Sequence, residues 1–260
     1  MNILDQIIEH KKKEVSQRKE LFPVRALEQS VYFGSPTFSM KEYIRRSDKS
    51  GIIAEFKRRS PSKGLINGNA AVEETTQGYV RAGASALSVL TDQQFFGGSN
   101  DDLSRARKGN SCPILRKDFT IDEYQIIEAK SIGADAILLI AAVLDPLSSK
   151  RMAALAHSLG MEVLLEVHNE EELSKNLEAG ADLIGVNNRN LKTFVVSTDV
   201  SKQLAPMIPA GIVKVSESGI SSPQTIAGLK EYGYEGFLIG ENFMKNNRPE
   251  LSAAEFIKQL

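Results

Sequence analysis

The chain has 260 residues, of which 42% are hydrophobic and 25% charged, so it has enough apolar material for a sizeable core and is not a disordered protein. The formal net charge of −1 excludes a whole-protein field that would attract nucleic acid or an anionic membrane, and any anionic ligand must be held by local cations. The single cysteine excludes an intramolecular disulfide, and without an uninterrupted apolar run we expect neither a signal peptide nor a membrane-spanning segment. We therefore expect a cytoplasmic protein that binds a small molecule.

Residues 1–50 are expected to form a helical extension, and residues 51–260 a larger body, within one domain. Apolar residues recur at helical spacing near the N-terminus. Lys11, Lys12 and Lys13 lie elsewhere around the helical turn, and nearby glutamates interrupt the basic run. This pattern favours a solvated helix face over a nucleic-acid patch.

From residue 52 onward, helical segments repeatedly end in glycine and are followed at once by an apolar strand, as in RAGASALSVL and SIGADAILLI. Glycine in this position accepts the left-handed conformation that ends a helix. Successive strands start 21 to 34 residues apart, which leaves room for one helix between each pair. The predicted strands are 52–57, 86–90, 113–117, 136–140, 162–167, 183–187, 212–216 and 236–239.

The segments between the strands have helix signals, clearest in residues 122–133, 145–160 and 169–180, with Pro146 just inside the start of the second. Eight βα units predict an α/β fold, a closed TIM (β/α)8 barrel with an N-terminal helical extension. The alternative is an open doubly wound sheet. That fold would show fewer strands and a glycine-rich phosphate turn after the first, where this chain has KRRSPSKG.

Polar residues stand at the carboxyl ends of strands that are otherwise apolar. A strand buried on both faces should read as continuous aliphatic sequence, so these residues predict one shared polar mouth at one end of the barrel. They are Lys57, Lys117, Glu166, Asn187, Glu217 and the Gly240/Glu241 pair.

Three strands supply candidates for acid–base chemistry. Period-two alternation puts Glu55 and Lys57 on one face, either as a structural ion pair or as part of a site. An apolar mouth and a nearby Lys57 are expected to lower the pKa of Lys117 toward that of a useful general acid, although Asp118 could hold it as a plain ion pair. Burial would raise the pKa of Glu166 and a nearby lysine would lower it, and Glu166 is the leading candidate for a base.

The sequence supports neither a metal site nor acyl transfer, but it does support phosphate binding. His168 lies just past a strand, while His10 and His157 lie on helices, and none has partners at ligand spacing, so no metal site is expected. A GxSxG motif is missing, which disfavours acyl transfer. SESGISS and LIGEN place glycine directly after the seventh and eighth strands, where backbone N–H groups of barrels often bind phosphate.

AEFKRRSPSKG, ILRKDF, LLEVH, GVNNRNL, VSESGI and FLIGENFM, in this order and spacing, resemble the indole-3-glycerol-phosphate synthase family. The resemblance runs from the N-terminal extension to the last strand. It implies a carboxy-lyase of tryptophan biosynthesis that converts 1-(2-carboxyphenylamino)-1-deoxyribulose 5-phosphate to indole-3-glycerol phosphate with loss of carbon dioxide and water. It implies no cofactor, whether metal or nucleotide, and its partner is a phosphorylated small molecule rather than a nucleic acid or a membrane.

The resemblance also implies catalytic roles. Lys117 resembles the general acid that protonates the ketone oxygen, and Glu166 resembles the base of the later dehydration. Lys57 resembles a residue that contacts the substrate carboxylate and phosphate and assists as an acid. Glu55 and Asn187 resemble the partners that orient the catalytic residues.

Binding residues follow from the same resemblance. Phe119 is expected to stack on the anthranilate ring, with aliphatic residues of the N-terminal helix completing the wall, and Ser60 to shape a mobile lid. The remaining residues of the polar mouth and phosphate loops are Arg189, Glu217, Ser218, Gly219 and Gly240.

Glu241 departs from the family pattern, since many members have a small hydroxyl residue there. A carboxylate would repel a phosphate, so Glu241 is expected to turn outward and offer only its backbone N–H.

Two rival functions remain. A phosphoribosyl isomerase of the same fold would use a cysteine at a strand tip, whereas Cys112 precedes the third strand and belongs to the opposite end of the barrel. A non-catalytic phospholigand-binding barrel is disfavoured by the joint presence of Lys57, Lys117 and Glu166. The sequence does not fix the oligomeric state, and a monomer is expected.

Overall fold

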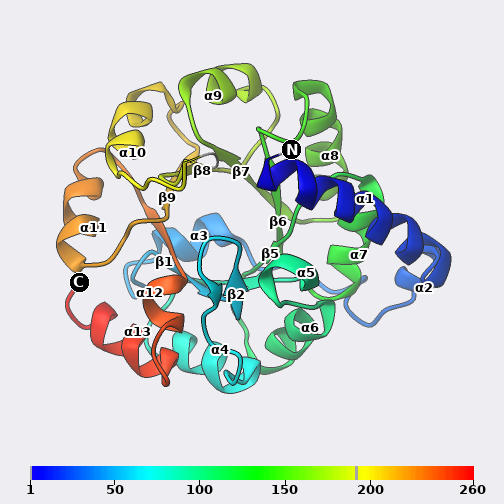
Figure 1. The fold of residues 1–260 in the computed structure, drawn as a ribbon, viewed down its shortest axis with the longest axis horizontal. Coiled ribbons are helices and arrows are strands. Elements are labelled where there is room, and N and C mark those ends of the chain that lie inside the picture. The colour runs from blue at the N-terminus through cyan, green and yellow to red at the C-terminus, as the bar shows by residue number, and fades with distance from the viewer. Residues whose placement is uncertain (1, 191–192) are drawn as a thin grey trace.

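The computed structural model describes residues 2–190 and 193–260, and its centre is a closed barrel of eight parallel strands (Figure 1). The predicted TIM barrel is confirmed, and every predicted strand is present with ends that differ by at most one residue. The strands are β1 (Ile52–Phe56), β4 (Ala86–Leu90), β5 (Ile114–Lys117), β6 (Ala136–Ile140), β7 (Glu162–Val167), β8 (Leu183–Asn187), β9 (Val213–Glu217) and β10 (Gly236–Ile239).

Helices surround the barrel (Figure 1). The three clearest predicted helices begin where expected, because Asp122, Asp145 and Asn169 accept hydrogen bonds from backbone N–H groups of the first turn. The helices are α4 (Val72–Arg81), α6 (Asn100–Gly109), α7 (Glu123–Ser131), α8 (Pro146–Ser158), α9 (Glu170–Asn176), α10 (Asp199–Leu204), α11 (Pro223–Lys230) and α13 (Pro249–Ile257).

The N-terminal extension forms α1 (Ile3–Leu21), α2 (Val24–Leu27) and α3 (Met40–Arg45). Met40 and Ile44 of α3 pack with side chains inside the barrel near the start of the strands. In Figure 1, α1 runs in dark blue toward α2 and α7. The first turns of α1 line the opposite end of the barrel, so the extension closes one end and borders the other.

The apolar core has two layers, one inside the barrel and one between the strands and the helices. Ile53 belongs to the inner layer, while Ile52 and Ala54 belong to the outer one. Side chains alternate along a strand, so Glu55 and Lys57 continue the inner face above Ile53. The predicted alternation on the first strand is confirmed, and it directs these charged groups into the barrel mouth.

Short elements complete the chain, and the sequence did not predict them. An antiparallel hairpin follows β1, and single helical turns follow β4, α10 and β10. The short elements are β2 (Arg59–Ser60), β3 (Gly64–Leu65), α5 (Gln93–Phe96), the 3-10 helix Ala205–Met207 and α12 (Glu241–Met244).

Within residues 2–190 and 193–260, no helix is long and apolar enough to cross a membrane.

Candidate active site

A cavity of about 540 Å³ lies at the carboxyl ends of the barrel strands. The polar strand tips meet there because parallel strands of a barrel all end at the same face. Every residue predicted for the site lines this one cavity. They are Glu55, Lys57, Ser60, Lys117, Phe119, Glu166, Asn187, Arg189, Glu217, Ser218, Gly219, Gly240 and Glu241.

One wall of the cavity is apolar. Ile3, Leu4 and Ile7 of α1 contribute to it, as predicted for aliphatic residues of the N-terminal helix. Phe119 also lines the cavity, and its ring centroid lies 5.9 Å from that of Phe96. Sequence reasoning missed Phe96, although its place shortly after a strand end was a usable signal. Together these side chains form a wall suited to a flat aromatic group.

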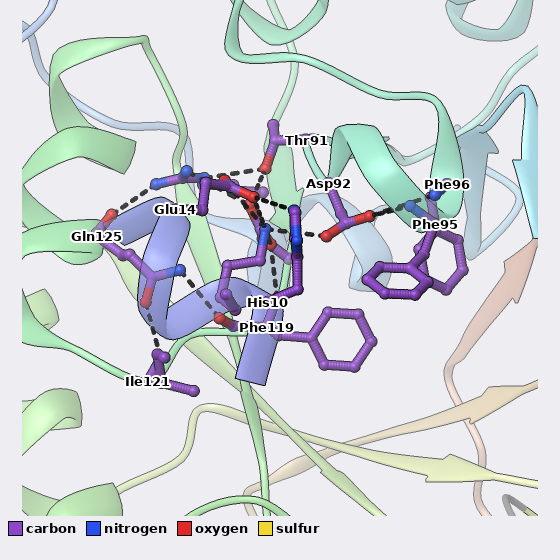
Figure 2. A network of polar contacts seen from close by, with 12 residues as sticks. His10, Glu14, Thr91, Asp92, Phe95, Phe96, Phe119, Ile121 and Gln125 are labelled. Atoms are coloured by element: carbon purple, nitrogen blue, oxygen red, sulfur yellow. Dashed lines mark hydrogen bonds and ion pairs between the residues drawn. The ribbon is translucent and has the colours of Figure 1, made fainter. Parts of the chain in front are cut away.

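A buried ion-pair network fixes α1 over the cavity (Figure 2). The Nζ atom of Lys11 lies 2.9 Å from Oδ2 of Asp92, 2.9 Å from Oδ1 of Asp118 and 3.0 Å from Oε2 of Glu14. Burial lowers the pKa of Lys11, but Asp118 and Asp92 outweigh burial and hold this pKa above its ordinary value. The ammonium group is therefore charged and fully buried.

This network corrects two expectations. Lys11 does not belong to a solvated helix face, since its side chain is inaccessible to solvent. Asp118 does not hold Lys117. Its carboxylate pairs with Lys11 and with Arg116 and accepts a hydrogen bond of 2.6 Å from Thr91. Lys117 is thus left to the carboxylates inside the barrel mouth.

Glu55 and Lys57 form an ion pair, with 2.7 Å between Oε1 and Nζ. Oε2 of Glu55 accepts a hydrogen bond of 3.3 Å from the buried hydroxyl of Ser88. Gly240 packs against the same carboxylate, and a Cβ atom there would lie 2.5 Å from Oε1. Whatever its part in phosphate binding, Gly240 provides the space that Glu55 occupies.

Lys117 lies at the centre of the charged groups. Its Nζ is 2.7 Å from Oε2 of Glu166 and 3.3 Å from Oε2 of Glu217. Burial lowers the pKa of Lys117, but Glu166, Glu217 and then Glu55 more than offset burial and raise it. The expectation of a lowered pKa is therefore wrong, because three carboxylates from different strands surround this ammonium group.

Glu166 is buried and held on both oxygens. Oε2 accepts a hydrogen bond from Lys117, and Oε1 accepts one of 3.0 Å from Nδ2 of Asn187. Burial raises the pKa of Glu166, but Lys117 and His168 outweigh burial and hold the pKa below its ordinary range. Glu166 is consequently an ionised, oriented carboxylate.

Glu217 differs from Glu166 although both contact the same lysine. Among the described residues, Oε1 of Glu217 has no hydrogen-bond partner. Burial raises the pKa of Glu217 to about 7, with Lys117 opposing the rise and Glu166 and Glu55 adding to it. Glu217 is thus a carboxyl group that changes protonation near neutral pH. Its charge depends on distances in the folded barrel, so it could not be predicted from the residue pattern.

The loop after β9 contributes backbone groups to the cavity. Ser218 and Gly219 both have positive φ, 67° and 75°. These φ values mark a turn directly after β9, and successive backbone N–H groups in a turn can converge on an anion. The position suits the phosphate role predicted for this loop.

Glu241, the first residue of α12, was expected to turn its carboxylate outward, but it faces two cations of the cavity. Its Oε2 lies 3.5 Å from Nη2 of Arg189, and its Oε1 lies 3.6 Å from Nζ of Lys63. All three residues line the cavity. The carboxylate does not simply turn outward: it lies between two cations that an incoming phosphate would also attract.

Ser60 is buried in the short hairpin after β1, with its hydroxyl 3.4 Å from that of Ser62. Beyond the hairpin, Nδ2 of Asn67 donates hydrogen bonds to the carbonyl oxygens of Met244 and Asn246. The loop is therefore joined to the end of α12.

In the described part of the chain, no cluster of three or more His, Cys, Asp or Glu side chains could hold a metal ion.

The fold and site together define a (β/α)8-barrel enzyme that moves protons on a small anionic molecule. The family profile described as Indole-3-glycerol phosphate synthase matches residues 4–259. The chain belongs to this family, which makes it a carboxy-lyase of tryptophan biosynthesis, as the sequence resemblance implied.

Curated relatives agree. The indole-3-glycerol phosphate synthase of Bacteroides thetaiotaomicron is 49% identical and covers 100% of this chain and 99% of its own length. That of a Polaromonas species is 44% identical, covering 98% and 97%. The solved N-acetylmannosamine-6-phosphate 2-epimerase of Clostridium perfringens has a TM-score of 0.60 at 14% identity, covering 82% of this chain and 94% of that one. At such low identity, this likeness shows the fold alone.

Proposed function

We propose that the cavity converts 1-(2-carboxyphenylamino)-1-deoxyribulose 5-phosphate to indole-3-glycerol phosphate with Lys117 as general acid and Glu166 as general base. The observation that carries this assignment is the 2.7 Å contact between Nζ of Lys117 and Oε2 of Glu166 inside the cavity. A donor and an acceptor in direct contact can pass a proton between successive steps without solvent.

Ring closure is the first step. The aromatic carbon that bears the carboxylate attacks the ketone carbon and forms a carbon–carbon bond, while Lys117 donates a proton to the ketone oxygen. The carboxylate then leaves as carbon dioxide, and its electron pair restores the aromatic ring. Because the ring itself accepts these electrons, the step needs no electron-sink cofactor.

Dehydration is the second step. The new hydroxyl group receives a proton from Lys57 and leaves as water, and Glu166 removes a proton from the five-membered ring to complete the indole. Over both steps two protons are delivered and one is removed. One proton taken up from solvent balances the carboxylate lost as carbon dioxide, and together with the proton on Glu166 it restores the ammonium forms of Lys57 and Lys117.

Substrate charge explains the other cavity residues. Lys57 is positioned to balance the substrate carboxylate with Glu55 as its orienting partner, and Asn187 orients Glu166. Arg189 and the backbone of Ser218 and Gly219 are positioned for the phosphate, and the apolar wall for the aromatic ring. Binding of carboxylate, ring and phosphate at separate points would hold the two reacting carbons together.

The test is to add the substrate to the purified protein and to follow indole fluorescence. We expect Lys117→Met to lower kcat by about a hundredfold or more. Lys175→Met is the matched control, since Lys175 is exposed and pairs with Glu171 on α9. An inactive wild-type protein would contradict the activity, and a Lys117→Met variant as active as the control would contradict the acid assignment.

The isomerase alternative has little support from the site. Cys112 is buried just before β5, and burial raises the pKa of its thiol to about 12. A thiol with such a pKa is a poor proton carrier at neutral pH. A non-catalytic barrel would bind the substrate without forming indole, which the same assay detects.

We also propose that the chain is a cytoplasmic monomer of one domain. The lone cysteine supports a reducing compartment, and the buried Lys11 network supports one continuous structure from α1 to the barrel. Light scattering of the purified protein tests the monomer, and a single unfolding transition tests the single domain.

A further inference from the structure

His168 follows the last residue of β7 and has no role in the proposed chemistry. Its side chain is only 9% exposed, and it lies two residues beyond Glu166. Burial of a polar ring so close to the proposed base calls for an account of what its two nitrogen atoms do.

One nitrogen is held by Glu172. The Nδ1 atom of His168 lies 3.0 Å from Oε2 of Glu172, and the backbone N–H of His168 donates to the same oxygen at 2.8 Å. Glu172 is itself fixed by the residue that caps α9, because Nδ2 of Asn169 donates to its other carboxylate oxygen at 2.9 Å. The ring therefore has a defined orientation.

The second nitrogen faces the proposed base. The Nε2 atom of His168 lies 3.3 Å from Oε1 of Glu166. It makes no hydrogen bond of ordinary geometry with the described residues, so this contact is an ion pair rather than a hydrogen bond. Both ring nitrogens thus face carboxylates, and a neutral imidazole can offer an N–H group to only one of them. The arrangement suits the doubly protonated, cationic ring.

We propose that His168 is a positioning residue which, as an imidazolium held by Glu172, keeps Glu166 ionised and fixes its carboxylate so that Oε2 faces Lys117. This inference rests on the proposed function only in taking Glu166 as the base. Burial alone lowers the pKa of His168, but the contacts with Glu166 and Glu172 outweigh burial and raise that pKa to about 10.

The other charged groups near Glu166 support this role. Lys117 on β5 faces its Oε2, Glu217 on β9 lies across Lys117, and Glu55 on β1 adds negative charge to the same mouth. Glu217 meets Lys117 but no second cation within ion-pair distance in the described residues. Burial raises its pKa to about 7, whereas the pKa of Glu166 is lowered. The environments of Glu166 and Glu217 differ in that His168 contacts only Glu166.

The first experiment compares pH profiles of kcat and KM for His168→Asn and His157→Asn. His157 is the matched control, because its Nε2 also pairs with a carboxylate, that of Asp182, but far from the cavity at the start of β8. Without the imidazolium, Glu166 should accept a proton at higher pH. We expect the acidic limb of the kcat profile to move up by about one pH unit, with kcat about tenfold lower on that limb and KM changed less than about threefold.

The second experiment reads the proton itself and does not depend on activity. The chain has 3 histidines, so the imidazole nitrogen NMR signal lost in His168→Asn identifies His168. At pH 8 we expect that signal to be an imidazolium, and we expect Glu172→Gln to lower its titration midpoint by about one unit or more.

The outcomes separate the two proposals. A neutral His168 at pH 8 overturns the inference even in an active enzyme. A folded His168→Asn variant whose kcat profile keeps its acidic limb also overturns it, since a merely structural role would lower kcat at every pH. If the wild type forms no indole, the proposed function fails, whereas the NMR titration still decides the charge of His168.

Discussion

The ammonium group of Lys11 lies 2.9 Å from Oδ1 of Asp118, and both side chains are buried. Asp118 directly follows Lys117, so this pair connects the helix that forms the apolar wall with the strand that carries the proposed acid. Burial raises the pKa of Asp118, but Lys11 and Arg116 outweigh burial and lower it to about 2. Both members are therefore charged over the ordinary pH range.

Lys11→Met should destabilise the protein and disturb the apolar wall of the cavity that α1 forms. Removing one partner of a buried ion pair leaves the other charges uncompensated, which costs about 3–5 kcal/mol of unfolding free energy. Urea unfolding measures this loss. We also expect KM to rise more than kcat falls, because α1 places Ile3, Leu4 and Ile7 on the cavity.

Lys12→Met provides the comparison for Lys11. Lys12 is the next residue, but its side chain is 60% exposed and pairs with exposed Glu9. Its loss should change the unfolding free energy by less than about 0.5 kcal/mol. Equal effects of the two substitutions would show that the buried network does not hold α1.

The arrangement of the backbone was predictable from local signals. Apolar runs of strand length, glycines at helix ends and regular spacing set eight strands, and a barrel brings their carboxyl ends together. Glu55 and Glu217 could therefore be placed at one mouth although 162 positions separate them. No long-range information was needed, because the closure of the barrel supplies it.

Charge states could not be predicted in this way. Whether Lys117 gains or loses proton affinity depends on how many carboxylates turn toward it, and these come from three other strands. The burial of Lys11 depends on Asp92 and Asp118, which lie far along the chain. The orientation of His168 likewise depends on side-chain contacts, since Glu172 holds one ring nitrogen and Asn169 holds Glu172.

Glu217→Gln should change how stability depends on pH. The folded-state pKa of Glu217 is about 7, raised by burial from an ordinary 4.5. A raised carboxyl pKa contributes stability that is fully present below about pH 4.5 and is lost as the pH rises through about 7. We expect the wild type to lose on the order of 3 kcal/mol relative to the variant across this window.

Urea unfolding of both proteins between about pH 4.5 and pH 8 measures this difference. Glu231→Gln, at an exposed position after α11, should give a curve parallel to that of the wild type. If the Glu217→Gln curve were also parallel, burial would not raise the pKa of Glu217.

Glu241→Gln tests the carboxylate that lies between Arg189 and Lys63. A phosphate group entering the cavity must compete with Glu241 for these cations and is repelled by its charge. Partly exposed pairs of this kind contribute up to about 1 kcal/mol, so KM for the phosphorylated substrate should fall about three- to fivefold. The effect should shrink as ionic strength rises, because salt screens exposed charges.

Glu235→Gln is a close control for Glu241→Gln, since both carboxylate side chains are 36% exposed and each pairs with an arginine. Glu235 pairs with Arg45 of α3, at the end of the barrel remote from the cavity, and its loss should leave KM unchanged. A rise in KM for Glu241→Gln would reverse the interpretation: Glu241 would then be holding Arg189 and Lys63 in position for the phosphate rather than competing with it.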